Sequence, residues 1–122
     1  MIVAGFGFRR SATAESLADA LGRAGGPARV RAVASAADKA ASSPFLRFAD
    51  ALGLPVVAVS EKDLGRQSTV TLSAASLSAR GVGSVAEAAA LAGAGPGARL
   101  LSARVISADG LATCALAERA DP

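Results

Sequence analysis

The chain has 122 residues, which is enough for one domain that buries about two-thirds of the surface of its unfolded chain. Apolar residues make up 52% of the chain and charged residues 19%, a composition that excludes disorder and predicts a packed core over residues 1–122. The net charge is +3 and the only aromatic residues are four phenylalanines, which favours a small anionic ligand over a nucleic acid.

The residue types that are absent exclude several kinds of site. Because the chain has no histidine, a Ser-His-Asp triad, a Cys-His pair and a histidine-ligated metal are excluded, and we predict no metal and no cofactor. Cys114 is the single cysteine and has no partner for an internal disulfide. No apolar stretch is long enough to span a membrane, and the short apolar start indicates a first strand rather than a signal peptide. We therefore expect a cytoplasmic protein with no membrane partner.

The first half of the chain alternates between strand and helix patterns. Residues 1–5 are an apolar run that predicts a short buried strand ended by glycine. Leu17 and Leu21 fall on one face of a helix predicted from Thr13 to Ala24. The next predicted elements are a strand over 30–35, a helix that Ser43 caps and that ends at Gly53, and a strand over 54–59.

The second half begins less regularly. Residues 60–63 predict a short helical turn, and 65–82 predict a brief strand or an extended loop. Ser84 and Glu87 form a capping-box pattern, in which the serine hydroxyl accepts from the Glu87 N–H and the carboxylate reaches back; the helix that follows runs to about residue 92. Strands over 99–106 and 111–117 follow, joined at Asp109-Gly110.

This order of elements predicts an α/β fold. Alternating strands and helices favour a parallel sheet covered on both faces, and a closing hairpin requires one antiparallel strand. We expect a three-layer α/β/α domain with a mixed, mostly parallel five-stranded sheet and a C-terminal β-hairpin.

The first candidate site is the segment GFGFRR at residues 5–10. Gly5 and Gly7 resemble the start of a dinucleotide fingerprint, but arginine stands at the third glycine position and no acidic residue follows the second strand. A strand-to-helix turn with exposed N–H groups beside Arg9 and Arg10 would suit a carboxylate as readily as a phosphate. The structural alternative is a plain tight turn.

Two further candidates follow later strands. Asp38 and Lys39 come directly after the second strand, where α/β folds place ligands, although an exposed ion pair explains them equally well. Gly83 precedes Ser84 and Glu87 and would let a ligand approach a second helix N-terminus, while the capping box alone would explain the two side chains.

Several segments together resemble one family. GFGFRR, VASAADKA, LGLPVVAVS, GVGSVAEAAALAGAG, ARLLSAR and LATCALAER follow the order and spacing of the CobE / CbiG C-terminal domain family of cobalamin (vitamin B12) biosynthesis. The similarity spans essentially the whole chain, and 83–91 is its most specific part. A chain that starts directly at the first strand is most like the free-standing CobE-type members, which are associated with the aerobic route.

The resemblance implies a small α/β domain that acts on or binds a precorrin, a tetrapyrrole-derived ring edged with carboxylates. Family members often have cysteine where this chain has Phe8, and lysine where it has Arg104. Positive charge is thus kept while a candidate nucleophile is lost, which favours binding over catalysis. The expected substrate-binding residues are Gly5, Gly7, Arg9, Arg10, Asp38, Lys39, Gly83, Ser84, Glu87 and Arg104.

Two alternatives remain open. The resemblance also implies a hydrolase like the cobalt-precorrin-5A hydrolase, which opens a lactone and releases acetaldehyde; Glu87 or Asp38 would then act as acid or base. The other alternative is a non-catalytic scaffold for another enzyme of the pathway. The expected ligand is a precorrin or a corrinoid like hydrogenobyrinic acid.

Overall fold

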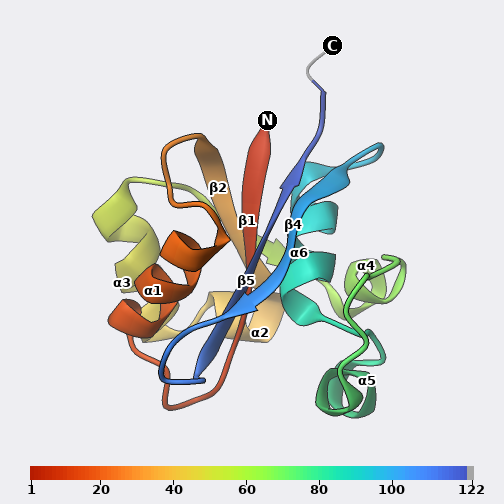
Figure 1. Cartoon of the computed structure of the whole chain (residues 1–122), viewed down its shortest axis with the longest axis horizontal. Coiled ribbons are helices and arrows are strands. Elements are labelled where there is room, and N and C mark those ends of the chain that lie inside the picture. The colour runs from red at the N-terminus through yellow and green to blue at the C-terminus, as the bar shows by residue number, and fades with distance from the viewer. Residues whose placement is uncertain (121–122) are drawn as a thin grey trace.

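A five-stranded mixed sheet forms the centre of the computed structural model, which describes residues 1–120 (Figure 1). The strand order is β3-β2-β1-β5-β4. The strands are β1 (Ile2–Phe8), β2 (Val30–Ala36), β3 (Val56–Val59), β4 (Arg99–Ile106) and β5 (Ala112–Glu118). The helices are α1 (Ala14–Ala24), α2 (Ala37–Ala40), α3 (Ser43–Leu52), α4 (Glu61–Gly65), α5 (Ala74–Arg80) and α6 (Val85–Ala94).

The strand pairing confirms the predicted fold class. β1, β2 and β3 are mutually parallel, whereas β5 lies antiparallel between β1 and β4. β4 and β5 form the predicted C-terminal hairpin, and Gly110 in its turn has a φ of 73°, a conformation that glycine adopts without strain. Four of the five strands therefore run in the same direction.

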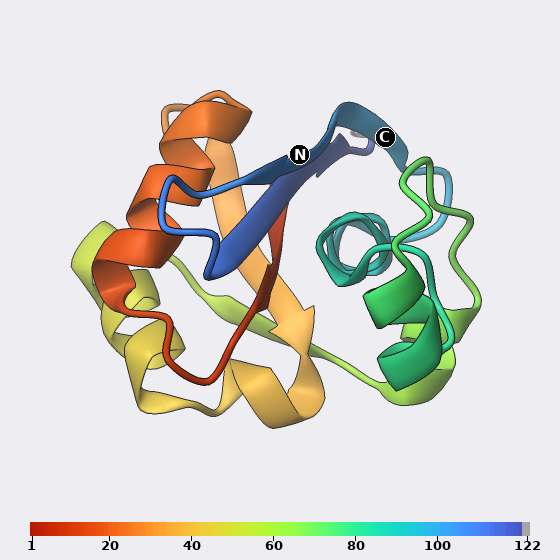
Figure 2. The same cartoon turned by 60° about the horizontal axis from the view of Figure 1, so that its bottom comes forward.

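Two apolar clusters hold the layers together. Phe6, Leu17 and Phe45 belong to the cluster between the sheet and the helices α1 and α3. Val3 and Ala89 belong to the cluster between the sheet and α6 on the opposite face. Figure 2 shows α1 and α3 on one side of the sheet and α6 on the other, with α4 and α5 beyond it.

The N-terminal glycines are strand residues, which corrects the predicted turn. β1 continues to Phe8, so Gly5 and Gly7 pair with β5 rather than open a helix. A Cβ at Gly5 would lie 2.8 Å from the Cα of Ala90 and closer still to backbone atoms of Ala86 and Ala90. Gly5 is required because α6 packs directly against β1 at this point.

Other boundaries also differ from the predictions. Within the 65–82 segment, residues 66–73 form the loop that was one of the two predictions, but 74–80 form the helix α5, with Ser73 as its N-cap. The N-cap of α3 is Ser42 rather than Ser43, and β3 begins at Val56, two residues later than predicted. The short helix α2 holds Asp38, which lies outside any predicted helix. No helix in residues 1–120 has the length and apolar character needed to cross a membrane.

Candidate functional site

A cavity of about 510 Å³ opens at the carboxyl end of β1, at the point where the chain changes winding direction. After β1 the chain forms β2 and β3 on one side of β1, and α1 and α3 cover one face of the sheet. It then passes through α6 on the opposite face and forms β4 and β5 on the other side of β1. Such a switch point leaves a crevice outside the strand ends, where α/β folds bind ligands. The lining residues are Gly7, Phe8, Arg9, Ser35, Lys39, Ser73, Ala75, Ser76, Ala79, Arg80, Ser84, Val85, Arg104, Ile106, Gly110, Leu111, Ala112 and Thr113.

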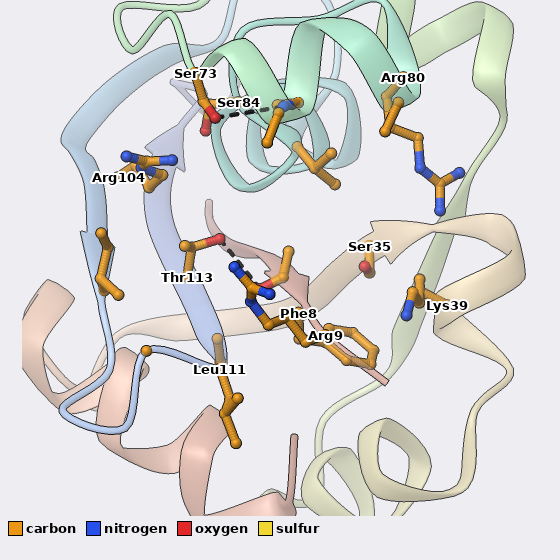
Figure 3. A pocket seen from close by; sticks show the side chains of 18 residues that line it. Phe8, Arg9, Ser35, Lys39, Ser73, Arg80, Ser84, Arg104, Leu111 and Thr113 are labelled. Carbon is orange, nitrogen blue, oxygen red and sulfur yellow. Dashed lines mark hydrogen bonds between the residues drawn. The ribbon is translucent and has the colours of Figure 1, made fainter. Parts of the chain in front are cut away.

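Every charged side chain that lines the cavity is a cation. Arg9 lies in the loop after β1, Lys39 lies in α2, Arg80 ends α5 and Arg104 lies in β4, so four separate segments supply them (Figure 3). Within residues 1–120, Arg9, Lys39 and Arg104 form no salt bridge. Three cations that have no acidic partner in the described part of the chain therefore face one cavity, and no carboxylate from that part lines it.

The fourth cation is already neutralised. Arg80 donates two hydrogen bonds of 2.8 Å to Asp38 and another to Glu61. The Arg80 guanidinium lowers the pKa of Asp38 below its ordinary value, mainly through the side-chain hydrogen bonds. Asp38 thus belongs to the ion pair that anchors α5, and of the two interpretations open for Asp38 and Lys39, an ion pair between these neighbours is not formed within residues 1–120.

Lys39 lies instead above an aromatic ring. Its ammonium is 5.2 Å from the centre of the Phe8 ring, a cation–π distance. Phe8 in turn stacks on Phe45, with ring centres 5.5 Å apart and an interplanar angle of 9°. Together with Val85, Ile106 and Leu111, Phe8 gives the cavity an apolar wall beside its cations.

Glu87 does not make the reciprocal bond of the predicted capping box. Ser84 Oγ accepts from the Glu87 N–H at 3.2 Å as expected. The buried carboxylate, however, accepts from the N–H groups of Val70, Thr71 and Arg104 at 2.7, 2.9 and 2.8 Å, and from the Thr71 hydroxyl at 2.6 Å. Burial raises the pKa of Glu87, but these hydrogen bonds outweigh it and hold the pKa below its ordinary value. The carboxylate is ionised near neutral pH, which argues against a role as a general acid.

The structure brings together half of the residues that the sequence singled out. Gly7, Arg9, Lys39, Ser84 and Arg104 line the cavity. The other five do not line it: Gly5 lies under α6, Arg10 is exposed in the loop after β1, Asp38 pairs with Arg80, Gly83 is buried against Thr69, and Glu87 is buried behind the wall. Two helix N-termini were predicted at the site. Of these two, only the start of α6 lies at the cavity, because α1 begins beyond it at Ala14.

Several residues that line the cavity were not predicted from the sequence. Ser73, Ser76 and Arg80 belong to the region of α5, which was predicted as a strand or loop. A helix signal was present, since Ser73 caps α5 and Arg80-Gly81 ends it with a basic residue and a left-handed glycine. Thr113 comes from the antiparallel strand β5, and its hydroxyl donates to the Gly7 carbonyl at 3.1 Å. Only the sheet register brings Thr113 beside Gly7.

The lining residues determine which chemical groups the cavity offers. The lining residues include cations, hydroxyls and an apolar wall, but no carboxylate, and the chain has no histidine. Ser35, at the end of β2, uses its hydroxyl to donate to the Phe6 carbonyl at 2.8 Å. A serine whose hydroxyl proton is donated to a backbone carbonyl is not hydrogen-bonded to a base that would activate it as a nucleophile.

Comparison with known proteins identifies the family. The family model described as "Cobalamin synthesis G C-terminus" (CbiG_C) matches residues 2–117. The crystal structure of CobE, a protein from the cobalamin (vitamin B12) biosynthetic pathway, is 34% identical with a TM-score of 0.83, covering 98% of this chain and 91% of CobE. The cobalamin biosynthesis protein chiG from Agrobacterium tumefaciens is 31% identical with a TM-score of 0.75, covering 99% of this chain and all (100%) of the other. No match to a curated protein was found. The chain therefore belongs to the CbiG C-terminal family of cobalamin biosynthesis proteins.

Proposed function

We propose that this protein binds a corrin-ring intermediate of cobalamin biosynthesis and holds the carboxylates of its side chains with Arg9, Lys39 and Arg104. The observation that carries the proposal is the convergence on one cavity of these three cations, which have no acidic partner among residues 1–120. Cations that face a cavity without a counter-ion favour an anionic ligand, and arginine recognises carboxylates through paired hydrogen bonds.

The apolar wall supports the same ligand class. A precorrin has a broad apolar ring with acetate and propionate groups at its edge, so its receptor needs both kinds of surface. Ile106 and Leu111 lie on the β4–β5 side of the cavity, and Val85 starts α6. A cavity of about 510 Å³ is within the range of drug-sized ligands, so it would take one carboxylate-bearing edge of the larger ring.

Titration with hydrogenobyrinic acid, followed by its absorbance, tests the proposal. We expect binding that weakens as salt rises, and a loss of about tenfold or more for each of Arg9→Ala, Lys39→Ala and Arg104→Ala. Arg47→Ala is the matched control, because Arg47 is an exposed arginine of α3 that does not line the cavity. Absence of binding, or equal losses in the control and the cavity variants, would refute the proposal.

The same preparation separates the alternatives. If the protein were a lactone hydrolase, incubation with the lactone intermediate would release acetaldehyde; we expect the intermediate to be bound and recovered unchanged. If it were only a scaffold, it would co-purify with another enzyme of the pathway and would not change the absorbance of the corrinoid.

A further inference from the structure

Glu87 joins three segments that are far apart in the sequence. It projects from the first turn of α6, is fully buried, and binds the 70–71 segment and the backbone of β4 at once. One carboxylate oxygen accepts from the N–H groups of Val70 and Thr71, and the other accepts from the Thr71 hydroxyl and the Arg104 N–H. All four bonds lie between 2.6 and 2.9 Å.

A buried carboxylate at this position is not explained by packing. Within residues 1–120, Glu87 forms no salt bridge. Hydrogen bonds alone therefore compensate for the hydration that the carboxylate loses on burial. The rest of the buried face of α6 consists mostly of alanine, which packs against the sheet without that cost. The role of Glu87 must therefore lie in the groups that it holds.

The first of these groups is the backbone of Arg104. In the β4–β5 ladder Ser102 pairs with Leu116 and Val105 with Cys114, so two residues of β4 stand opposite Ala115 alone. This is a β-bulge, which redirects side chains and leaves an N–H without its partner in the ladder. The Arg104 N–H donates to Glu87 instead, and the Arg104 side chain lines the cavity.

The second group is the segment that leads into α5. Val70 and Thr71 are bound by Glu87 immediately before Ser73, which caps α5 and lines the cavity. No residue of α5 is buried, so this helix depends on attachments at its ends. Glu87 supplies the attachment before α5, and the Arg80 ion pairs supply the one at its last turn.

We propose that Glu87 is a positioning residue of the cavity: by holding the β4 bulge and the 70–71 segment, it directs Arg104 toward the ligand and fixes the wall that α5 forms. The inference rests on the proposed function for the identity of the ligand. It does not require Glu87 to touch the ligand, since the carboxylate lies behind the wall.

A double-mutant cycle tests this coupling. Glu87→Gln keeps the size of the side chain but places an NH₂ group against donors, so we expect a loss of hydrogenobyrinic acid affinity of about tenfold, comparable to that of Arg104→Ala. Because the part of the effect that acts through Arg104 is absent once the Arg104 side chain is removed, the further loss that Glu87→Gln causes in the Arg104→Ala background should be smaller than its loss of about tenfold in the wild type. In the Lys39→Ala background, by contrast, Glu87→Gln should reduce the affinity by the same factor as in the wild type.

Two further variants serve as a control for destabilisation and as a milder substitution. Leu91→Ala, on α6 but away from the cavity, is the control for destabilisation and should leave the affinity unchanged. Thr71→Val removes a single donor to Glu87; it is the milder variant if Glu87→Gln does not fold, and its smaller loss of affinity should likewise be reduced in the Arg104→Ala background.

A measurement without ligand separates this inference from the proposed function. In the free protein, Glu87→Gln should accelerate hydrogen exchange at the amides of Val70, Thr71 and Arg104, whereas Leu91→Ala should not do so selectively. If the wild-type chain binds no corrinoid but these amides respond, the proposed ligand is wrong and the positioning role stands. Unchanged exchange, or a Glu87→Gln loss that multiplies fully with that of Arg104→Ala, would overturn the positioning role.

Discussion

Arg80 and Asp38, which are 42 residues apart in the sequence, form a two-pronged ion pair whose two hydrogen bonds both measure 2.8 Å. The guanidinium also binds Glu61, so the last residue of α5 is tied to both α2 and α4. Only 17% of the Arg80 side chain is exposed, compared with 64% for Asp38, so the arginine lies inside the contact. This contact closes one side of the cavity through charge rather than apolar packing.

Replacing Arg80 should therefore loosen α5 far more than the whole fold. For Arg80→Ala we expect faster hydrogen exchange across 74–80, while the free energy of unfolding falls by only about 1 kcal/mol, as is typical of partly exposed ion pairs. Arg66→Ala is the matched control, because Arg66 forms an exposed pair with Asp63 outside the cavity. Protection of α5 equal to that of the wild type would contradict this account of its anchoring.

The close packing of α6 on β1 predicts opposite effects for two glycine substitutions. A Cβ at Gly5 would collide with the backbone of α6, so Gly5→Ala should destabilise the fold by about 3 kcal/mol or more. Gly22 lies within α1 with nothing near its added Cβ, so Gly22→Ala should stabilise by about 0.5–1 kcal/mol. Urea unfolding of both variants measures the two shifts, and equal shifts would refute the packing argument.

The sequence predicted those parts of the fold that have strong local signals. The periodicity of Leu17 and Leu21, the Asp109-Gly110 turn and the alternation of strands and helices were enough for the five-stranded mixed sheet and its hairpin. Gly5 and Gly7 were misassigned, because glycine suits a turn and a close backbone approach equally well from local sequence. Which of the two applies depends on α6, about 80 residues later.

The candidate site was predicted in part for the same reason. Arg9 and Lys39 follow the carboxyl ends of parallel strands, a position that topology alone marks as a ligand site. Arg80 was missed because α5 has no buried face and hence no apolar periodicity to read. The bonding of Glu87 depends on a β-bulge near Arg104, and no local sequence pattern indicates that break in the strand register.

The Cys114 thiol should be unreactive toward thiol reagents in the folded protein. Its side chain is fully buried in β5, and this burial raises the pKa of the thiol far above its ordinary value of 9.0. Because the thiolate is the reactive form, a thiol reagent should label Cys114 only as fast as the protein unfolds. Comparing the labelling rate of Cys114 in water with that in denaturing urea tests this prediction. Rapid labelling in water would show that the strand opens locally.

The hairpin turn should make stability sensitive to acid. The Asp109 carboxylate accepts from the hydroxyls of Ser107 and Ser16 and from the N–H of Leu111, and Asp19 accepts from the N–H of Ala108. These bonds join the turn to α1. Asp109 is bound chiefly by the Ser107 hydroxyl and Asp19 chiefly by the Ala108 N–H, and the pKa of each lies below its ordinary value of 3.8.

The sign of the acid effect follows from these lowered pKa values. A carboxyl whose pKa is lower in the folded state contributes stability that is complete above its ordinary pKa and is lost as the pH falls through the lowered one. Urea midpoints should hence be level from pH 7 to about 5 and fall below about pH 4. Asp109→Asn should be less stable than the wild type at pH 7, and the difference should shrink as the pH falls. Asp50→Asn, at an exposed position of α3, is the control; a difference for Asp109→Asn that stays constant down to pH 2 would contradict the assignment.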